Sequence, residues 1–322
     1  MKILKSFNTL RKRKFFKSSN TLRKIVGIKS LLSFFGRASK KAIYLNQGRQ
    51  GLDPSQIKAA DILFKDIAIK YKDAPKSTEP INKTLFLFWW DGFDSAPEIV
   101  KLCVKSVIKN YPDYNIILLD KTNLKEYLPE DDIVFQAYMK GKTIIQNFTD
   151  YLRFYLMYNY GGYWIDSTLF FLKRFPLDEV IGDEDFGSIG FSTLSRCFYV
   201  DGIGTKWCDF FYGARKHAPI CKAFLECFQR YYSKYNFPFD YFMMDCILFV
   251  FMKYFIENGV LDRIKTYPGS AIYVFQGVGI NAEVDERKIY ECEIMPQKLD
   301  RKIKLSKVKK GRLLDYLLNT VR

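Results

Sequence analysis

One stretch of the chain, residues 147–170, limits the possible folds more than any other. The spacing of its apolar and aromatic residues predicts a helix that ends at the glycine pair 161–162, because adjacent glycines permit a helix stop and a tight turn. The β-prone run 163–165 (Tyr-Trp-Ile) then predicts a short strand. Asp166 follows this run directly, so we expect its carboxylate to project from the end of a buried strand into a cleft.

The predicted helix carries an acid and a base three residues apart, Asp150 and Arg153, which places both on one face. On a solvated helix such a pair is an ordinary surface ion pair worth roughly 0.3–0.5 kcal/mol. Here Leu152, Leu156 and many aromatic residues indicate a largely buried helix, and buried charges need partners. We therefore expect the pair and Asp166 to line one site that grips a polyhydroxylated, phosphorylated ligand. For Asp166 alone, the alternative is a strand-end aspartate that caps a turn.

Two further apolar runs predict a parallel sheet. Residues 84–90 and 115–119 are short and unbroken, and each is followed by an aspartate, as is typical of buried strands. The segment 97–110 between them has helical spacing and begins with proline. Strand, helix and strand form a βαβ unit, and such sheets bind ligands at the carboxyl ends of their strands. Of Trp89 and Trp90, one indole is expected to stack on a flat base and the other to pack in the core; the alternative places both in the core.

The rest of the chain supports one large α/β domain. With 322 residues and 48% hydrophobic content, the chain can bury a sizeable core. We assign this domain to residues 53–322, after a basic extension at residues 1–52. The stretch 284–322 is basic and has no clear pattern. Further helices are predicted near 55–71, 130–140, 219–234 and 241–257, and strands at 186–191 and 197–200.

The net charge of +16 lies almost entirely in the basic extension. Residues 1–52 contain fourteen Lys or Arg and no acid, so the other 270 residues carry only +2. Basic clusters alternate there with apolar residues, which suits an amphipathic helix on an anionic membrane surface. The alternatives are a solvated tail or a helix docked on its own domain. Nucleic acid is the other usual partner of basic arms, but no base-stacking module follows, and we predict no nucleic-acid partner.

Cysteine and histidine usage excludes several classes of protein. Seven cysteines with no Cys-x-x-Cys pair suggest neither a disulfide framework nor a zinc ribbon, so a reducing cytosol is the expected compartment. The single histidine, His217, excludes His-rich metal sites and argues against a histidine-based triad. No apolar run approaches the ~20 residues that a membrane span requires. The N-terminus lacks the apolar core and cleavage site of a signal peptide.

These motifs together resemble the capsular polysaccharide synthesis proteins. That group is related to glycosyltransferases with an Asp-x-Asp sugar-binding region and, more distantly, to the clostridial glucosylating toxins. The likeness covers roughly residues 80–260. Its pieces are 88–92 (Phe-Trp-Trp-Asp-Gly), 96–100 (Ala-Pro-Glu-Ile-Val), 111–114 (Tyr-Pro-Asp-Tyr), 149–153 (Thr-Asp-Tyr-Leu-Arg), 158–168 (Tyr-Asn-Tyr-Gly-Gly-Tyr-Trp-Ile-Asp-Ser-Thr) and 240–242 (Asp-Tyr-Phe) with Asp245.

The resemblance implies a GT-A fold, in which an α/β sheet flanked by helices binds a nucleotide-sugar. It implies that Asp150 and Arg153 contact the hydroxyls and phosphate of the donor. The aromatic ring of Trp164 would lie by the nucleotide, and Trp89 would stack on the base. Asp166 would contact the ribose and a metal ion.

One position departs from the wider Asp-x-Asp pattern. Residues 166–168 read Asp-Ser-Thr, so Thr168 stands where the direct metal ligand is usually an aspartate. The resemblance implies Mn²⁺ or Mg²⁺ near Asp166 and Thr168, but a hydroxyl is a weak, neutral ligand. Either a second ligand comes from elsewhere, or the diphosphate holds most of the ion. Asp245, on a predicted helix, is our candidate for orienting the acceptor or the sugar; the alternative is a surface acid beside Lys253.

The leading hypothesis is a glycosyltransferase of the hexosyltransferase type. It would move a sugar from a nucleotide-sugar donor, with a UDP-sugar favoured, to a surface polysaccharide, an oligosaccharide or a lipid-linked glycan. The relatives imply retention of anomeric configuration. A cytoplasmic location is expected, with residues 1–52 on the inner face of the cell membrane. The alternative is a non-catalytic sugar-binding or scaffold subunit of a polysaccharide assembly complex; a nucleic-acid binder is a weaker third hypothesis.

Overall fold

The structure, a computed structural model, describes residues 52–191, 199–200, 203–204, 208–255 and 264–322. The central sheet is made of β1 (Thr84–Phe88), β2 (Asn115–Leu119), β3 (Gly162–Ile165), β5 (Phe186–Ser188) and β9 (Phe211–Ala214). Their order is β2-β1-β3-β9-β5. β1 pairs in parallel with β2 and β3, whereas β9 runs antiparallel to β3 and β5. The sheet is mixed and flanked by helices, which confirms the predicted α/β class.

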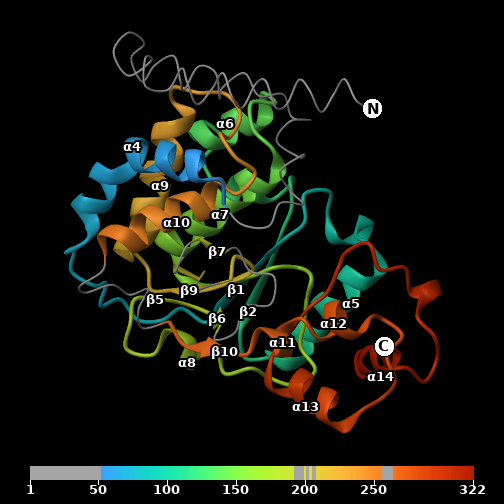
Figure 1. The fold of residues 1–322 in the computed structure, drawn as a ribbon. Helices are drawn as coiled ribbons and strands as arrows, with labels where there is room; N and C mark the ends of the chain where they lie inside the picture. The colour runs from blue at the N-terminus through green and yellow to red at the C-terminus, as the bar shows by residue number, and fades with distance from the viewer. Residues whose placement is uncertain (1–51, 192–198, 201–202, 205–207, 256–263) are drawn as a thin grey trace, which may run out of the picture.

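Helices cover the sheet on two sides. The larger helices are α4 (Pro54–Tyr71), α5 (Glu98–Asn110), α7 (Ile145–Tyr160), α9 (Pro219–Tyr232) and α10 (Met243–Tyr254). Shorter helices are α6 (Ile133–Met139), α8 (Leu177–Ile181), α11 (Gly269–Ile272), α12 (Val274–Val278), α13 (Glu286–Ile294) and α14 (Leu313–Asn319). In Figure 1, α4, α7, α9 and α10 lie above the sheet, and α8, α11 and α13 lie below it.

The predicted βαβ unit is confirmed as β1, α5 and β2. All five residues of β1 are buried, and α5 packs its apolar face inward. The two strands align from the pair Thr84 and Asn115 to the pair Phe88 and Leu119. The prediction of a buried second strand is wrong for most of β2, because β2 lies at the edge of the sheet and is only partly covered.

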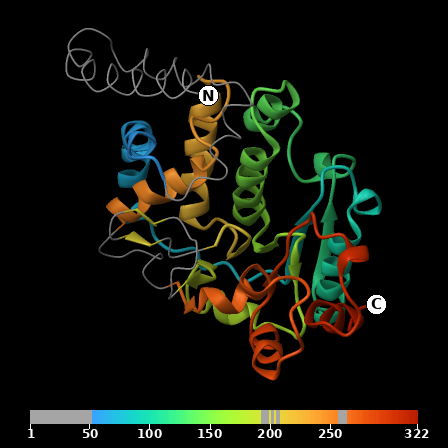
Figure 2. The same ribbon diagram turned by 45° about the vertical axis from the view of Figure 1, so that its right-hand side comes forward.

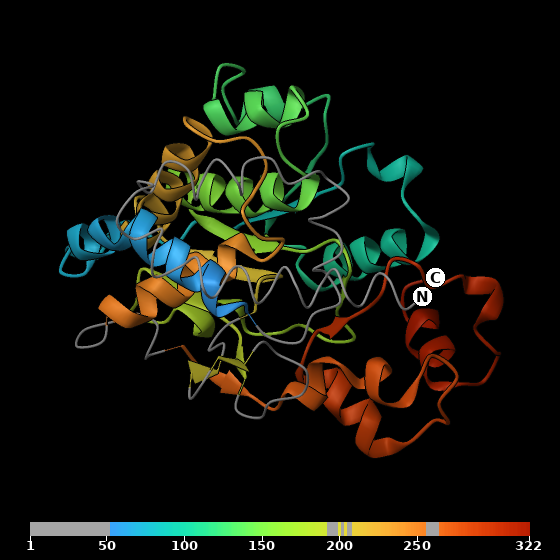
Figure 3. The same cartoon turned by 45° about the horizontal axis from the view of Figure 1, so that its top comes forward.

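Aromatic packing holds the upper helical layer together. Phe154 of α7 stacks on Phe224 of α9, with ring centroids 4.0 Å apart and planes 2° apart. Figure 3 shows α4, α9 and α10 side by side, and all three contribute to one large apolar cluster. The helices predicted near 55–71, 130–140, 219–234 and 241–257 are therefore confirmed as α4, α6, α9 and α10, with ends that differ by a few residues.

The C-terminal stretch, in which no sequence pattern was found, packs against helix α5. Helix α14 buries four leucines against the outer face of α5, and Figure 2 shows these elements together. A short strand, β11 (Gln297–Lys298), pairs antiparallel with β4 (Leu169–Phe170). β4 follows β3 closely in the chain, so this pairing brings residue 298 beside the carboxyl end of β3.

Several predictions fall wholly or partly outside the described residues. The basic extension is one of them, apart from Leu52, and its separation from the domain 53–322 stays a prediction. The strand predicted at 186–191 is split into β5 and β6 (Gly190–Phe191), which pairs with β10 (Thr266–Tyr267). Of the strand predicted at 197–200, only β7 (Tyr199–Val200) is described; it pairs with β8 (Ile203–Gly204). Within the described part of the chain, no helix combines the length and apolarity needed to cross a membrane.

Candidate functional site

A cavity of about 700 Å³ opens at the carboxyl ends of β1 and β3. It lies between helix α7, the start of α10 and the segment after β11. All seven predicted site residues line this cavity: Trp89, Asp150, Arg153, Trp164, Asp166, Thr168 and Asp245. The predicted convergence of these groups on one site is therefore observed, although the chemical role of each residue stays a prediction.

The glycine pair sets the direction in which β3 leaves α7. Gly161 and Gly162 have φ angles of +68° and +94°, a region that residues with a Cβ rarely adopt. A Cβ on Gly162 would lie 2.5 Å from the carbonyl oxygen of Thr84. Glycine is therefore needed both for the turn and for the close approach of β3 to β1, which places Asp166 at the mouth of the cavity.

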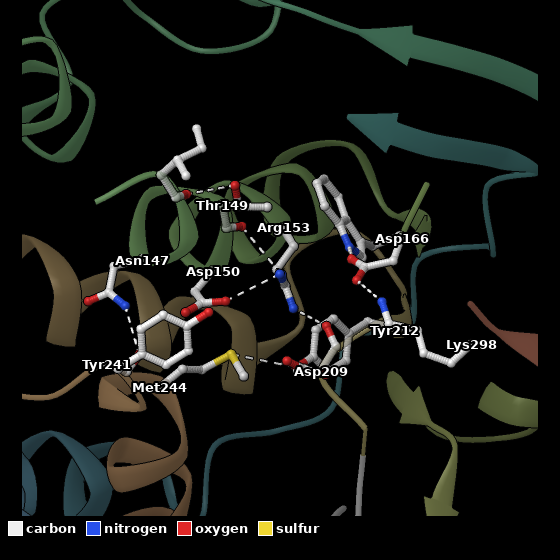
Figure 4. Close-up of polar contacts among 12 residues, drawn as sticks. Asn147, Thr149, Asp150, Arg153, Asp166, Asp209, Tyr212, Tyr241, Met244 and Lys298 are labelled. Atoms are coloured by element: carbon white, nitrogen blue, oxygen red, sulfur yellow. Dashed lines mark hydrogen bonds and ion pairs between the residues drawn. The ribbon is translucent and has the colours of Figure 1, made fainter. Parts of the chain in front are cut away.

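The acid and base of α7 form a buried ion pair. Arg153 Nη2 lies 3.2 Å from Asp150 Oδ1, and the two side chains are 6% and 12% exposed. The surface-pair alternative is therefore wrong. Figure 4 shows the guanidinium group between Asp150 and the backbone of Asp209, to whose carbonyl oxygen Arg153 Nη1 donates a hydrogen bond.

Further contacts fix the plane of the guanidinium group. Arg153 Nε donates to the carbonyl oxygen of Thr149 at 3.3 Å. The guanidinium carbon lies 5.3 Å from the ring of Trp164 and 5.7 Å from that of Tyr212. Arginine suits such a place because its planar group bonds at its edge and stacks at its face. The result is a pre-oriented cation at the wall of the cavity.

Burial controls the protonation of the acids around this cation. Burial raises the pKa of Asp150 to about 7, against the lowering effect of Arg153. Burial, together with the charges of Asp209 and Asp150, also raises the pKa of Asp245 well above its ordinary value. Burial would lower the pKa of Arg153, but Asp150 and Asp166 outweigh it and raise that pKa. Near neutral pH, Arg153 is charged while Asp150 is partly protonated.

Asp166 is held by two side chains at the end of β3. Trp164 Nε1 donates to Asp166 Oδ1 at 3.0 Å, and Lys298 Nζ donates to Asp166 Oδ2 at 2.5 Å. The same ammonium group donates to Thr168 Oγ1 at 2.8 Å. Burial would raise the pKa of Asp166, but Lys298 and Arg153 outweigh this effect and lower it. The side chain is thus an ionised partner of Lys298, and the turn-cap alternative is wrong.

Lys298 is the residue that sequence reasoning missed. It lies 132 positions after Asp166, in a stretch without a readable pattern. The pairing of β11 with β4 positions it, and Leu299 N–H donates to the carbonyl oxygen of Thr168 at 3.0 Å. The sequence contained no local signal for this contact. Asp209, Gln276 and Arg301 also line the cavity without having been predicted.

The residues present do not fit a metal site held by the protein. Asp166 offers one carboxylate and Thr168 one neutral hydroxyl, and the Lys298 ammonium already bonds to both. Mg²⁺ and Mn²⁺ favour several anionic oxygen ligands. Among the described residues, no group of three or more His, Cys, Asp or Glu is arranged to hold a metal ion. The metal implied by the resemblance therefore has no matching set of side chains here.

The two tryptophans after β1 have different surroundings. Trp90 meets Tyr138 edge-on, with centroids 4.9 Å apart and planes at 85°, and it also packs near Phe88 and Phe148. Trp89 is partly buried on the other side, against the apolar cluster that contains α14. Both line the cavity. Trp90 therefore belongs to the aromatic core, and Trp89 stays the candidate for stacking on a base.

Asp245 lies in the first turn of α10 and faces the cavity. Lys253, its proposed surface neighbour, instead lies 3.1 Å from Asp61 of α4. The alternative of a surface acid paired with Lys253 is therefore wrong. The loop before α10 is tied to α7, since Asn147 Nδ2 donates to the carbonyl oxygen of Tyr241 at 3.1 Å.

The raised pKa of Asp150 predicts a pH-dependent stability. An acid whose pKa is about 7 in the folded state and about 4 in the unfolded state is protonated in the folded protein and ionised in the unfolded protein between these two pH values. Stability contributed by this group is therefore full below pH 4 and is lost as the pH rises towards 7. We expect Asp150→Asn to reduce the pH dependence of the free energy of unfolding by up to about 1 kcal/mol per pH unit between pH 5 and 7. Urea unfolding at several pH values measures this dependence. The same dependence in the variant and the unchanged protein would contradict the raised pKa of Asp150.

One curated protein and one solved structure are similar to parts of the chain. Over 102 residues, 28% are identical to an O-glycosyltransferase, braB, of Annulohypoxylon truncatum, which covers 29% of this chain and 24% of that protein. The chain thus spans only about a quarter of the length of this curated relative. A solved structure, the PaToxG glycosyltransferase, aligns with 62% of this chain and 80% of its own, at 18% identity and a TM-score of 0.32.

The family assignment depends on a longer match. The family described as "Capsular polysaccharide synthesis protein" matches residues 52–317, which is most of the chain and nearly all of the described part. This range contains every residue that lines the cavity. The chain therefore belongs to the capsular polysaccharide synthesis protein family.

Proposed function

We propose that this protein is a glycosyltransferase that takes its sugar from a nucleotide-sugar donor. The observation that carries the proposal is the convergence at the carboxyl ends of β1 and β3. There a buried Asp150–Arg153 pair, the Asp166–Lys298 pair and the ring of Trp89 line one cavity. Its volume of about 700 Å³ is in the range that small-molecule and cofactor sites occupy.

The chemistry of sugar transfer assigns a role to each group. The bond between the anomeric carbon and the diphosphate breaks, a bond to an acceptor hydroxyl oxygen forms, and the proton of that hydroxyl passes to the departing diphosphate. Negative charge grows on the departing diphosphate, and a pre-oriented cation such as Arg153 stabilises it. Positive charge grows on the sugar, as in other oxocarbenium-like transition states. Asp150 and Asp245 are placed to orient sugar hydroxyls, and a partly protonated Asp150 can both donate and accept hydrogen bonds.

The finer points of the function rest on the family and on the resemblance. Retention of configuration, a hexosyl group and a UDP-linked donor are proposed from that likeness. The acceptor is proposed to be a capsular or other surface glycan, or a lipid-linked precursor of one. We propose that the protein acts in the cytoplasm, with residues 1–52 on the inner face of the membrane.

A panel of nucleotide-sugars tests the proposal. Purified protein is incubated with UDP-, GDP-, ADP-, CMP- and dTDP-sugars, with EDTA and separately with Mg²⁺ or Mn²⁺, and released nucleotide is measured. Slow hydrolysis of at least one donor is expected even without an acceptor. Failure to bind or hydrolyse any donor would refute the function.

Replacement of Trp89 tests the position of the base. Loss of one stacked aromatic ring costs about 1–3 kcal/mol per base, or roughly five- to 150-fold in affinity. We expect Trp89→Ala to weaken the binding of the free nucleoside diphosphate by an amount in this range, and Trp89→Phe to retain most of the affinity. Calorimetric titration measures both. Equal affinity of Trp89→Ala and the unchanged protein would place the base elsewhere.

One observation favours a second candidate function, a sugar-binding subunit without catalysis. Thr168 replaces the usual aspartate, and Lys298 neutralises the remaining carboxylate. This candidate predicts donor binding without turnover across a range of acceptors, whereas the transferase predicts turnover. Repeating the donor panel with a range of acceptor glycans, together with calorimetric titration of the donors, separates the two.

A further inference from the structure

We propose that the Lys298 ammonium group replaces a divalent cation at this site, so that the protein binds the diphosphate of its donor without a metal. This inference rests on the proposed function, since it concerns how the same cavity holds a nucleotide-sugar. It starts from a residue that lies outside the motifs of the resemblance.

The geometry at the end of β3 supports the replacement. Lys298 Nζ lies 2.5 Å from Asp166 Oδ2 and 2.8 Å from Thr168 Oγ1, so one cation bridges the two side chains expected to coordinate a metal. Figure 4 shows the lysine reaching Asp166 from the opposite side to Arg153. A metal bound to Asp166 and Thr168 would have to occupy the place of this ammonium group.

Backbone contacts of Lys298 and of the next residue fix the position of the lysine. Its backbone belongs to β11, which pairs with β4, and the next residue bonds to Thr168 through the backbone. The ammonium group also lies 5.1 Å from the centre of the Phe210 ring, which favours a cation. The side chains of Lys298 and Asp166 are 21% and 24% exposed, so the pair is shielded yet open to a ligand.

An ammonium group can hold a phosphate while it stays bound to the protein. It has three N–H donors, and the bonds to Asp166 and Thr168 use two of them. The third is left for a ligand oxygen. Lysine is a usual phosphate ligand, acting as a point charge. Arg153 and Arg301 line the same cavity and add positive charge for the second phosphate.

Acids outnumber bases on the cavity wall, with six aspartates and three basic residues. They do not add up to a metal site, because no three of the described acidic or metal-binding side chains gather closely enough. Asp91 is paired with Lys121 at 2.9 Å, and burial raises the pKa values of Asp150 and Asp245, which opposes a negative charge on either side chain. The acids therefore oppose a diphosphate less than their number suggests.

Calorimetric titration with UDP, GDP, ADP, CDP and dTDP tests the proposal on the full chain. We expect at least one of them to bind in EDTA, with a Kd that changes by no more than about threefold when Mg²⁺ or Mn²⁺ is added. In a second measurement, the electron paramagnetic resonance signal of free Mn²⁺ should stay the same when the protein without nucleotide is added.

Three variants separate the charge of the lysine from its bulk. Lys298→Met should weaken diphosphate binding by about ten- to a hundredfold, the usual effect of losing a hydrogen bond to a charged group. Lys298→Arg should retain most of the affinity. The exposed Lys304 lies outside the cavity lining, so Lys304→Met serves as the matched control and should bind like the unchanged protein.

The contrary outcomes are distinct. Diphosphate binding that needs Mg²⁺ or Mn²⁺, or Mn²⁺ uptake that Asp166→Asn abolishes, would overturn the inference and leave the proposed transferase intact. Undiminished affinity in a folded Lys298→Met variant would overturn it as well. If Lys298→Met does not fold, the EDTA and Mn²⁺ measurements on the unchanged protein decide alone. If no diphosphate binds under any condition, the proposed function fails and the inference fails with it.

Discussion

Replacing Asp166 with asparagine is expected to lower sugar transfer, or donor hydrolysis, by at least about a hundredfold. Asparagine keeps the size of the side chain and an oxygen for the Trp164 N–H, but it removes the charge that holds the Lys298 ammonium in place. The lysine would then be free to turn away from the donor, and the contact proposed for the ribose would be weakened. Release of nucleoside diphosphate measures the loss.

A matched variant and a stability measurement make this result interpretable. Asp94 is an exposed aspartate in the segment that follows β1, outside the cavity lining. Asp94→Asn should therefore transfer sugar at the unchanged rate. Urea unfolding of Asp166→Asn should show a folded protein. Full turnover in Asp166→Asn would show that Asp166 has no role in the reaction, which would remove the central element of the proposal.

Replacing Arg153 with methionine should cause the largest loss of stability, about 3–5 kcal/mol, because breaking a buried ion pair leaves the remaining groups without a partner. In this protein those groups are the Asp150 carboxylate and the carbonyl oxygens of Thr149 and Asp209. Donor binding should also be lost, since the cation proposed to face the diphosphate is removed. The free energy of unfolding in urea measures the first effect.

An exposed ion pair of the same residue types provides the control. Arg174 bonds to Asp113 through two nitrogen atoms, but both side chains are close to half exposed. Water and salt screen such a pair, so Arg174→Met should barely move the unfolding midpoint. In the double variant Asp150→Asn with Arg153→Met, we expect less destabilisation than the sum of the single effects. Strict additivity would show that Asp150 and Arg153 do not interact.

Much of this architecture could be predicted from local patterns. The period of the apolar residues predicted helices α4, α9 and α10, and the unbroken apolar run predicted β1, because these signals lie within one element. The glycine pair predicted the end of α7. The partly covered β2 shows the limit, since the position of a strand at the centre or edge of a sheet depends on partners far away in the sequence.

A buried helix with an acid–base pair, a strand ending in Asp166 and a βαβ unit could all be predicted from the sequence, because each depends on residues that are neighbours along the chain. The partner of Asp166 could not be predicted, because it depends on long-range packing. The partner is Lys298, brought from 132 positions away by a two-residue strand pairing. The burial that raises the pKa values of Asp150 and Asp245 also depends on the tertiary structure. Contacts of this kind depend on long-range packing, and a single sequence carries no periodic or local signal for them.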